Sequence, residues 1–261
     1  MKRIFVFALT VSLLAVGSSF AVMDGLVGAW LFDEGAGKVA GDSSGNGHDG
    51  ELVGNAEWED GGVFGSAVST DGTEAYVMIP DHEDLEFDGD FSIACWVQNE
   101  LPPPDHSSFV TKGYHRPSGN GGDARPWYLM YFLTGGTVDM FLRDLAGTNS
   151  RAVGATPVND GEWHHIVGVK DGNEVRIYID GEADGAAPAV DATYGENDQP
   201  LVFMVHFDRW FPGMIDEVAI FNRALTENEI EQVMDGLAPN VLSVEPVGKL
   251  AVTWGGLKEN R

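Results

Sequence analysis

The fold is decided near the end of the chain by residues 213–226, which read GMIDEVAIFNRALT. The apolar run 218–221 predicts a strand. Two carboxylates, Asp216 and Glu217, stand at the mouth of this strand. The segment therefore places acidic oxygens at the edge of a β-domain.

The same segment runs directly into a helix. Thr226 and Glu229 have the spacing of a capping box. Gly236 and Pro239 end the helix, which we expect to cover an edge or an end of the β-domain. The apolar stripe of this predicted helix consists of Ile230, Val233, Met234 and Leu237.

The rest of the chain has the pattern of an antiparallel all-β domain. Its 34 glycines, many of them in Asp-Gly and Asn-Gly pairs, separate short apolar runs. The clearest unit is a predicted hairpin, with one strand at 163–170, a turn at 171–173 and a second strand at 175–179. Helix is scarce by comparison.

The N-terminus has the layout of a secretory signal. Lys2 and Arg3 precede an apolar run over 4–16, and Ser19 and Ala21 occupy the small-residue positions that a signal peptidase reads. We predict cleavage after Ala21. The alternative is a membrane anchor that stays in place, although nothing downstream is apolar for long enough to form a second span.

Charge and cysteine usage limit the function classes further. Without Lys2 and Arg3 the chain has 13 basic and 41 acidic residues, so its net charge is 13 − 41 = −28 with neutral histidines. Such a surface repels nucleic acid and anionic membranes. Cys95 is the only cysteine and alternates with apolar neighbours, so we expect a buried thiol and no internal disulfide.

Six motifs occur in the order typical of one family, and the chain resembles it over residues 24–238. It is similar to the laminin-G-like jelly-roll domains of the concanavalin A-like lectin and glucanase superfamily. The resemblance implies a two-sheet antiparallel jelly-roll sandwich, here with one short C-terminal capping helix, neighbouring terminal strands and often one calcium ion. The motifs are VGAWLFDEG at 27–35, DSSGNGHDG at 42–50, FSIACWV at 91–97, GEWHHI at 161–166, IYIDG at 177–181, and 213–226.

A structural calcium site is the first prediction from this resemblance. Calcium takes six to eight oxygen ligands, which Asp42, Asn46 and the backbone carbonyl of His48 could supply together with Asp216 and Glu217 from the last strand. The alternative is that the segment around Asp42 is simply a tight turn. The ring of His48 is disfavoured as a transition-metal ligand, because no cysteine or second histidine lies at metal-binding spacing.

Binding is a better prediction than catalysis. No strand carries the alternating carboxylates of a glycoside hydrolase, and no nucleophile motif precedes a helix, so a polysaccharide hydrolase or lyase is the weakest alternative. We expect a non-catalytic module for an extracellular glycan or protein ligand; an adhesive or structural domain without a sugar pocket is the competing hypothesis. The candidate ligand-binding residues are Trp127, Tyr128, His206, Asp208, Arg209 and Trp210.

The chain is thus predicted to contain a signal peptide at 1–21, a jelly-roll domain at 22–240 and a tail at 241–261. The tail is either a sorting or anchoring segment or a loosely packed terminus. The expected location is outside the cell, secreted or at the cell surface, with no membrane span once the signal is removed.

Overall fold

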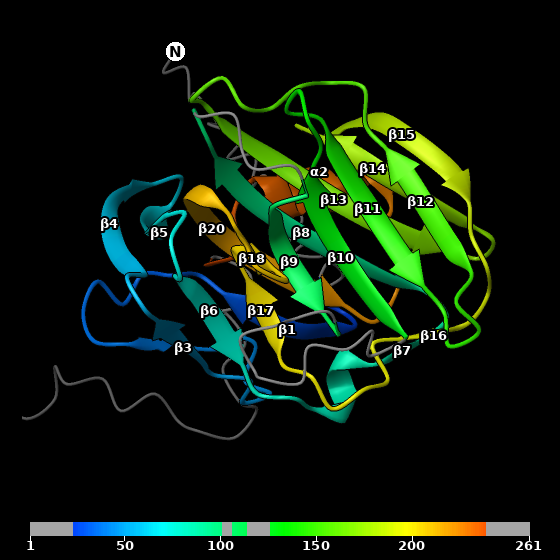
Figure 1. Ribbon diagram of the computed structural model, residues 1–261, viewed down its shortest axis with the longest axis horizontal. Coiled ribbons are helices and arrows are strands. Elements are labelled where there is room, and N and C mark those ends of the chain that lie inside the picture. The colour runs from blue at the N-terminus through cyan, green and yellow to red at the C-terminus, as the bar shows by residue number, and fades with distance from the viewer. Residues whose placement is uncertain (1–22, 101–105, 114–125, 239–261) are drawn as a thin grey trace, which may run out of the picture.

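The computed structural model describes residues 23–100, 106–113 and 126–238 of the chain (Figure 1). The predicted signal segment 1–21 and the predicted tail 241–261 lie outside these residues. Among the residues that are described, no helix has the length and apolar character needed to cross a membrane.

Two large antiparallel sheets form a sandwich, as predicted. In spatial order, the first contains β15 (Glu182–Pro188), β14 (Glu174–Ile179), β13 (Trp163–Asp171), β8 (Phe91–Gln98), β20 (Pro212–Phe221), β5 (Gly65–Asp71) and β4 (Glu57–Gly62), with β1 (Leu26–Trp30) also paired to β20. The second contains β12 (Asn149–Val153), β11 (Val138–Arg143), β10 (Trp127–Phe132), β9 (Ser108–Lys112), β17 (Leu201–Phe203), β6 (Tyr76–Ile79), β3 (Gly50–Val53) and β2 (Val39–Ala40).

Two short ribbons and two short helices complete the described fold. The strands β7 (Phe87–Asp88) and β16 (Thr193–Tyr194) form one ribbon, and β18 (Val205–His206) and β19 (Arg209–Trp210) form the other. The 3-10 helix η1 (Glu83–Leu85) follows β6, and α2 (Glu227–Met234) follows β20.

The core lies between the sheets, because alternate residues of each strand point inward. In β10, Tyr128, Met130 and Phe132 belong to this core, whereas Trp127 and Leu129 belong to a separate cluster on the outer face. The second sheet therefore presents apolar and aromatic side chains on both of its faces.

Two predicted strand pairings are confirmed. Strands β13 and β14 form the predicted hairpin, in which Asp171 pairs with Glu174. The first and last strands of the sandwich also pair, with Ala29 opposite Ala219. Cys95 is fully buried in the core, and burial raises the pKa of its thiol.

The helix α2 covers a face of the sandwich, whereas the sequence predicted an edge or an end. Its capping box is present, with the Thr226 amide donating to Glu229 Oε2 at 2.9 Å. Ile230 and Val233 pack with Val167 and Phe221 on the outer face of the first sheet. The difference arises because β8, β13 and β20 carry apolar residues on both faces, so this sheet needs a cover on its outer side.

Candidate functional site

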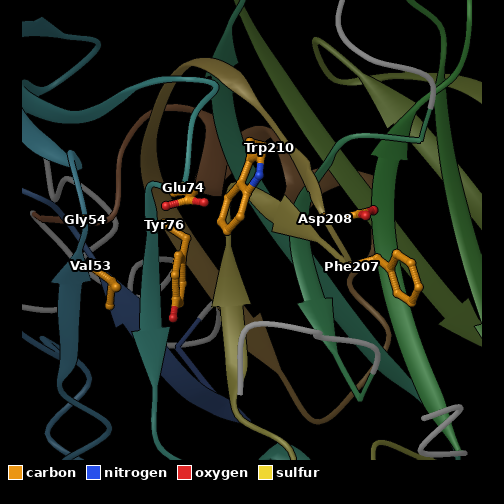
Figure 2. A pocket seen from close by; sticks show the side chains of 7 residues that line it. All are labelled: Val53, Gly54, Glu74, Tyr76, Phe207, Asp208 and Trp210. Carbon is orange, nitrogen blue, oxygen red and sulfur yellow. The ribbon is translucent and has the colours of Figure 1, made fainter. Parts of the chain in front are cut away.

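A surface hollow opens on the outer face of the second sheet, at one end of β3 and β6 (Figure 2). It has a cavity volume of about 510 Å³. Tyr76 reaches it because it alternates with Val77, which points into the core. The lining residues are Val53, Gly54, Glu74, Tyr76, Phe207, Asp208 and Trp210.

Two aromatic rings form the apolar part of the hollow. The ring centroids of Tyr76 and Trp210 lie 5.9 Å apart, with an angle of 37° between the ring planes. Both residues pack with Val202 and Val205, which belong to the same outer-face cluster. Burial raises the pKa of the Tyr76 phenol, and the charge of Glu51 adds to this effect. Tyr76 is therefore a neutral, fixed ring at neutral pH.

A strained turn carries the polar side of the hollow. Phe207 and Asp208 connect β18 to β19, in which His206 pairs with Arg209. Phe207 has a φ of +66°, a left-handed conformation that two-residue hairpin turns normally give to glycine or asparagine. The guanidinium carbon of Arg209 lies 5.9 Å from the centroid of the Phe207 ring. Phe207 is half-buried, and backbone strain at such a residue is a pointer to a functional position.

Glu74 places a second carboxylate at the rim. It too has a left-handed backbone, with a φ of +50°, and it is exposed. Glu74 and Asp208 thus flank the Tyr76 and Trp210 rings with hydrogen-bond acceptors (Figure 2). An apolar floor with a few polar groups at its rim is the usual composition of a ligand-binding pocket.

A second hollow lies on the same sheet, and residues of the β18–β19 ribbon line both hollows. Two of the residues that line the second hollow, Arg151 and Tyr131, donate hydrogen bonds to the fully buried carboxylate of Asp139, the Tyr131 hydroxyl at 2.9 Å. Burial lowers the pKa of His206 to about 4, so this ring is neutral at neutral pH. The lining residues are His106, Trp127, Leu129, Tyr131, Phe141, Arg143, Arg151 and His206.

Four of the six predicted ligand-binding residues line the two hollows, and a fifth, Arg209, lies in the strand ribbon beside them. Trp210 and Asp208 line the first hollow, and Trp127 and His206 line the second. Because Trp127 is only 4% exposed, the first hollow offers the more accessible aromatic surface.

Tyr128 is a correction to the predicted set. It is fully buried between the sheets, where its ring contacts Phe87 and Phe91 and its hydroxyl donates to the Leu85 carbonyl at 3.2 Å. Adjacent residues of a strand point to opposite faces, so Trp127 and Tyr128 cannot both face a ligand.

The predicted calcium ligands around Asp42 form a self-contained turn. The Asp42 carboxylate accepts three backbone hydrogen bonds, from Ala29, Ser44 and His48. Burial opposes ionisation of Asp42, but the hydrogen bonds outweigh it and lower its pKa. The side chain of Asn46 donates to carbonyls of β1, and the His48 carbonyl accepts from the Trp30 indole at 2.9 Å. These groups hold the turn against β1 and Trp30.

Asp216 and Glu217 are buried at a bulge in β20 and have other partners. Asp216 accepts hydrogen bonds from the amides of Val63, Phe64 and Glu217, and Glu217 accepts one from Leu237. Burial raises the pKa of each carboxyl to about 7. The carboxylates of Asp42 and Asp216 thus accept hydrogen bonds from separate sets of amides, and the shared calcium site stays a prediction.

Comparisons with known proteins agree with this architecture. The chain matches a laminin-G family model, described as the concanavalin A-like lectin/glucanases superfamily, over residues 71–231, which is more than half of its length. None of the curated proteins matches the chain.

Three solved structures of protein domains are similar to this chain. The binding domain of Paraclostridial Mosquitocidal Protein 1 is 17% identical, with a TM-score of 0.64, and the match covers 81% of this chain and 52% of that one. Domain 4 of AbnA, a GH43 extracellular arabinanase from Geobacillus stearothermophilus, in complex with arabinotriose, is 20% identical, with a TM-score of 0.61 and coverage of 80% and 97%. The Botulinum neurotoxin serotype D ligand binding domain, in complex with N-acetylneuraminic acid, is 13% identical, with a TM-score of 0.64 and coverage of 84% and 53%.

The chain spans about half the length of the two toxin domains. At these identities the structural likeness establishes the fold, and the family follows from the sequence match. The chain belongs to the concanavalin A-like lectin/glucanase superfamily.

Proposed function

We propose that the protein is an exported, non-catalytic module that binds a neutral glycan in the hollow around Tyr76 and Trp210. The observation that carries this proposal is the pairing of the half-buried Trp210 ring with the Tyr76 ring, which is 8% exposed, in a hollow flanked by the carboxylates of Glu74 and Asp208. The apolar face of a pyranose or furanose ring stacks on an aromatic side chain, and its hydroxyls donate to carboxylates.

The charge of the site favours a neutral glycan over an acidic one. Two carboxylates border the hollow, and the whole chain has a formal charge of −26. An anionic sugar would be repelled both at the site and on approach. Among the structural neighbours, the complex of the arabinanase domain with arabinotriose supports this choice more directly than the sialic acid complex of the neurotoxin domain.

Burial of the two carboxylates with the most elevated pKa values supports a role without catalysis. Asp216 is fully buried and Glu217 is 1% exposed. Glycoside hydrolysis requires a pair of carboxyl groups that flank the scissile bond in an open cleft. Asp216 and Glu217 therefore have no access to a polysaccharide chain.

A glycan array with neutral and sialylated glycans tests the proposal. We expect hits among neutral glycans, and Trp210→Ala should weaken the binding roughly tenfold or more, because loss of the stacked ring removes about 1.5 kcal/mol. Trp163→Ala is the matched control, since Trp163 lies in β13 of the other sheet. An array without hits for the folded protein, or equal binding by Trp210→Ala, would favour the adhesive alternative.

A further inference from the structure

A second candidate site lies at the opposite end of the β3–β6 pair. One nitrogen of His48, one nitrogen of His82 and one carboxylate oxygen of Asp84 all lie within 4.8 Å of one another. Among the described residues, this is the one group of at least three histidine, cysteine or acidic side chains that lie so close together. The rings of His48 and His82 lie 4.7 Å apart between centroids.

Antiparallel pairing of two neighbouring strands brings the two histidines together. Strand β3 pairs with β6 so that Glu51 lies opposite Met78. His48 comes shortly before β3 and His82 shortly after β6, so both leave the sheet at the same end. His82 is the N-cap of η1, which places Asp84 in the first turn of that helix.

The backbone of His48 is fixed on both sides. Its amide donates to Asp42 Oδ2 at 3.0 Å, and its carbonyl accepts from the Trp30 indole at 2.9 Å. The side chain is only 3% exposed and points toward Asp84. Within the described part of the protein, His48 Nε2 is buried and has no hydrogen-bond partner. The Asp84 carboxylate lies 3.4 Å from this nitrogen without forming a hydrogen bond to it, and a bound metal ion is one way to satisfy such a buried polar atom.

We propose that His48, His82 and Asp84 bind one zinc ion, with a fourth position open to water or to an external ligand. In a tetrahedral zinc site with bonds of about 2.0–2.1 Å, neighbouring ligand atoms lie about 3.3–3.4 Å apart. Asp84 Oδ2 lies 3.4 Å from His48 Nε2 and 3.3 Å from His82 Nδ1. Two of the three donor spacings thus match those of a zinc site before the ion arrives, and the third, between the two histidine nitrogens, is within 4.8 Å.

The donor set selects zinc over calcium. Two imidazole nitrogens and one carboxylate suit zinc, whereas calcium requires six to eight oxygens. Asp84 also lines a surface cavity together with Asn46, Glu83 and Glu86. Two further carboxylates beside this cavity favour the approach of a cation.

One existing hydrogen bond must yield to the metal. His82 Nδ1 accepts the Asp84 amide at 3.2 Å, and zinc would take over that lone pair. His82 and Asp84 are each about half exposed, so both can adjust. The ion would fasten the loop before β3 to η1. The site shares no residue with the glycan hollow, so either proposal can fail without the other.

The test uses the full chain without a histidine tag, stripped with EDTA and titrated with zinc chloride at pH 7.5 by calorimetry. We expect one zinc ion to bind per chain and to raise the melting temperature. Calcium chloride should not bind at this site. Replacement of zinc by cobalt should produce the visible absorption of a four-coordinate ion. His82→Gln and Asp84→Asn should each weaken zinc binding by roughly 100-fold.

The matched control is His164→Gln. His164 also contacts two carboxylates, but its Nδ1 lies 2.8 Å from Asp180 and its Nε2 lies 3.1 Å from Asp160, so its two nitrogens face different groups. This variant should bind zinc like the unmodified chain. The proposal is overturned if the folded protein does not bind zinc, or if His82→Gln and Asp84→Asn both bind it as tightly as the control.

Discussion

Glu217→Gln should stabilise the protein at high pH and have a much smaller effect at low pH. Glu217 is 1% exposed, its Oε2 accepts the Leu237 amide at 2.6 Å, and its Oε1 is buried with no hydrogen-bond partner among the described residues. Glutamine has nearly the same shape and retains an oxygen for the Leu237 amide. The substitution therefore removes a buried charge with little change in packing.

The magnitude follows from the raised pKa of this carboxyl. One pH unit of pKa displacement corresponds to about 1.4 kcal/mol. Raising the pKa from 4.5 to about 7 makes ionisation of Glu217 about 3 kcal/mol less favourable in the folded protein than in the unfolded chain. Between these two pKa values the folded protein holds a proton that the unfolded chain has lost. The stability of the unmodified protein therefore falls as pH rises through this window.

Thermal melts at pH 5 and pH 8.5 in EDTA provide the assay. For a domain of this size, about 3 kcal/mol corresponds to a difference of roughly 6–12 °C. The melting temperature of Glu217→Gln minus that of the unmodified protein should therefore be larger at pH 8.5 than at pH 5, by up to that amount. Glu59→Gln, on the exposed strand β4, controls for loss of a surface charge.

A variant whose advantage is the same at both pH values, or greater at pH 5, would refute the reasoning. Repeating the melts with calcium adds a second readout. If calcium stabilises the unmodified protein at pH 8.5 but not Glu217→Gln, Glu217 is a calcium ligand, as the sequence predicted.

Three further substitutions test the turn, the helix connection and the glycan hollow. Asp42→Asn removes an acceptor for backbone amides and should lower the free energy of unfolding by about 1–3 kcal/mol. Thermal melts in EDTA and in calcium should show the same loss of stability. A loss seen only in calcium would contradict the turn interpretation. Ser92→Ala leaves the buried Leu225 amide and the Arg223 carbonyl without their partner and should lower the free energy of unfolding in urea by about 1–3 kcal/mol. Phe207→Gly relieves the backbone strain of the left-handed conformation at this turn, so the melting temperature should stay the same or rise. Glycan binding measured by calorimetry should fall, because the Phe207 ring is lost. Unchanged binding would show that Phe207 does not belong to the site.

The sequence predicted those parts of the fold that have a local chemical signal. The capping box at Thr226 and the Gly172 turn between β13 and β14 depend on neighbouring residues, and both are confirmed. Several strands were not predicted, among them the edge strands β4, β12 and β15. Strands β4 and β15 consist of exposed and half-buried residues, and β12 alternates in burial but buries only Ser150 and Ala152, so none of the three has the alternation of large apolar residues that marks a half-buried strand.

The candidate sites show what a single sequence leaves undetermined. Aromatic residues on β10 and after β17 were recognisable as candidates, but which side of a strand faces outward depends on the partner sheet, so Tyr128 was included wrongly. Tyr76 had no local signal, because its alternation with Val77 is equally compatible with either orientation. The sequence predicted the His48 carbonyl as a calcium ligand and set its ring aside as a transition-metal ligand for lack of a second histidine at metal-binding spacing, yet strand pairing brings His82 to its side.

The pairing of β1 with β20 has a consequence for the use of this domain as a building block. Leu26 lies opposite Phe221, so the chain enters and leaves the sandwich at adjacent positions (Figure 1). A host protein could accommodate the whole unit in a single surface loop without being pulled apart. A short linker between these positions would likewise allow the chain to be opened elsewhere, in a circularly permuted form of the same sandwich.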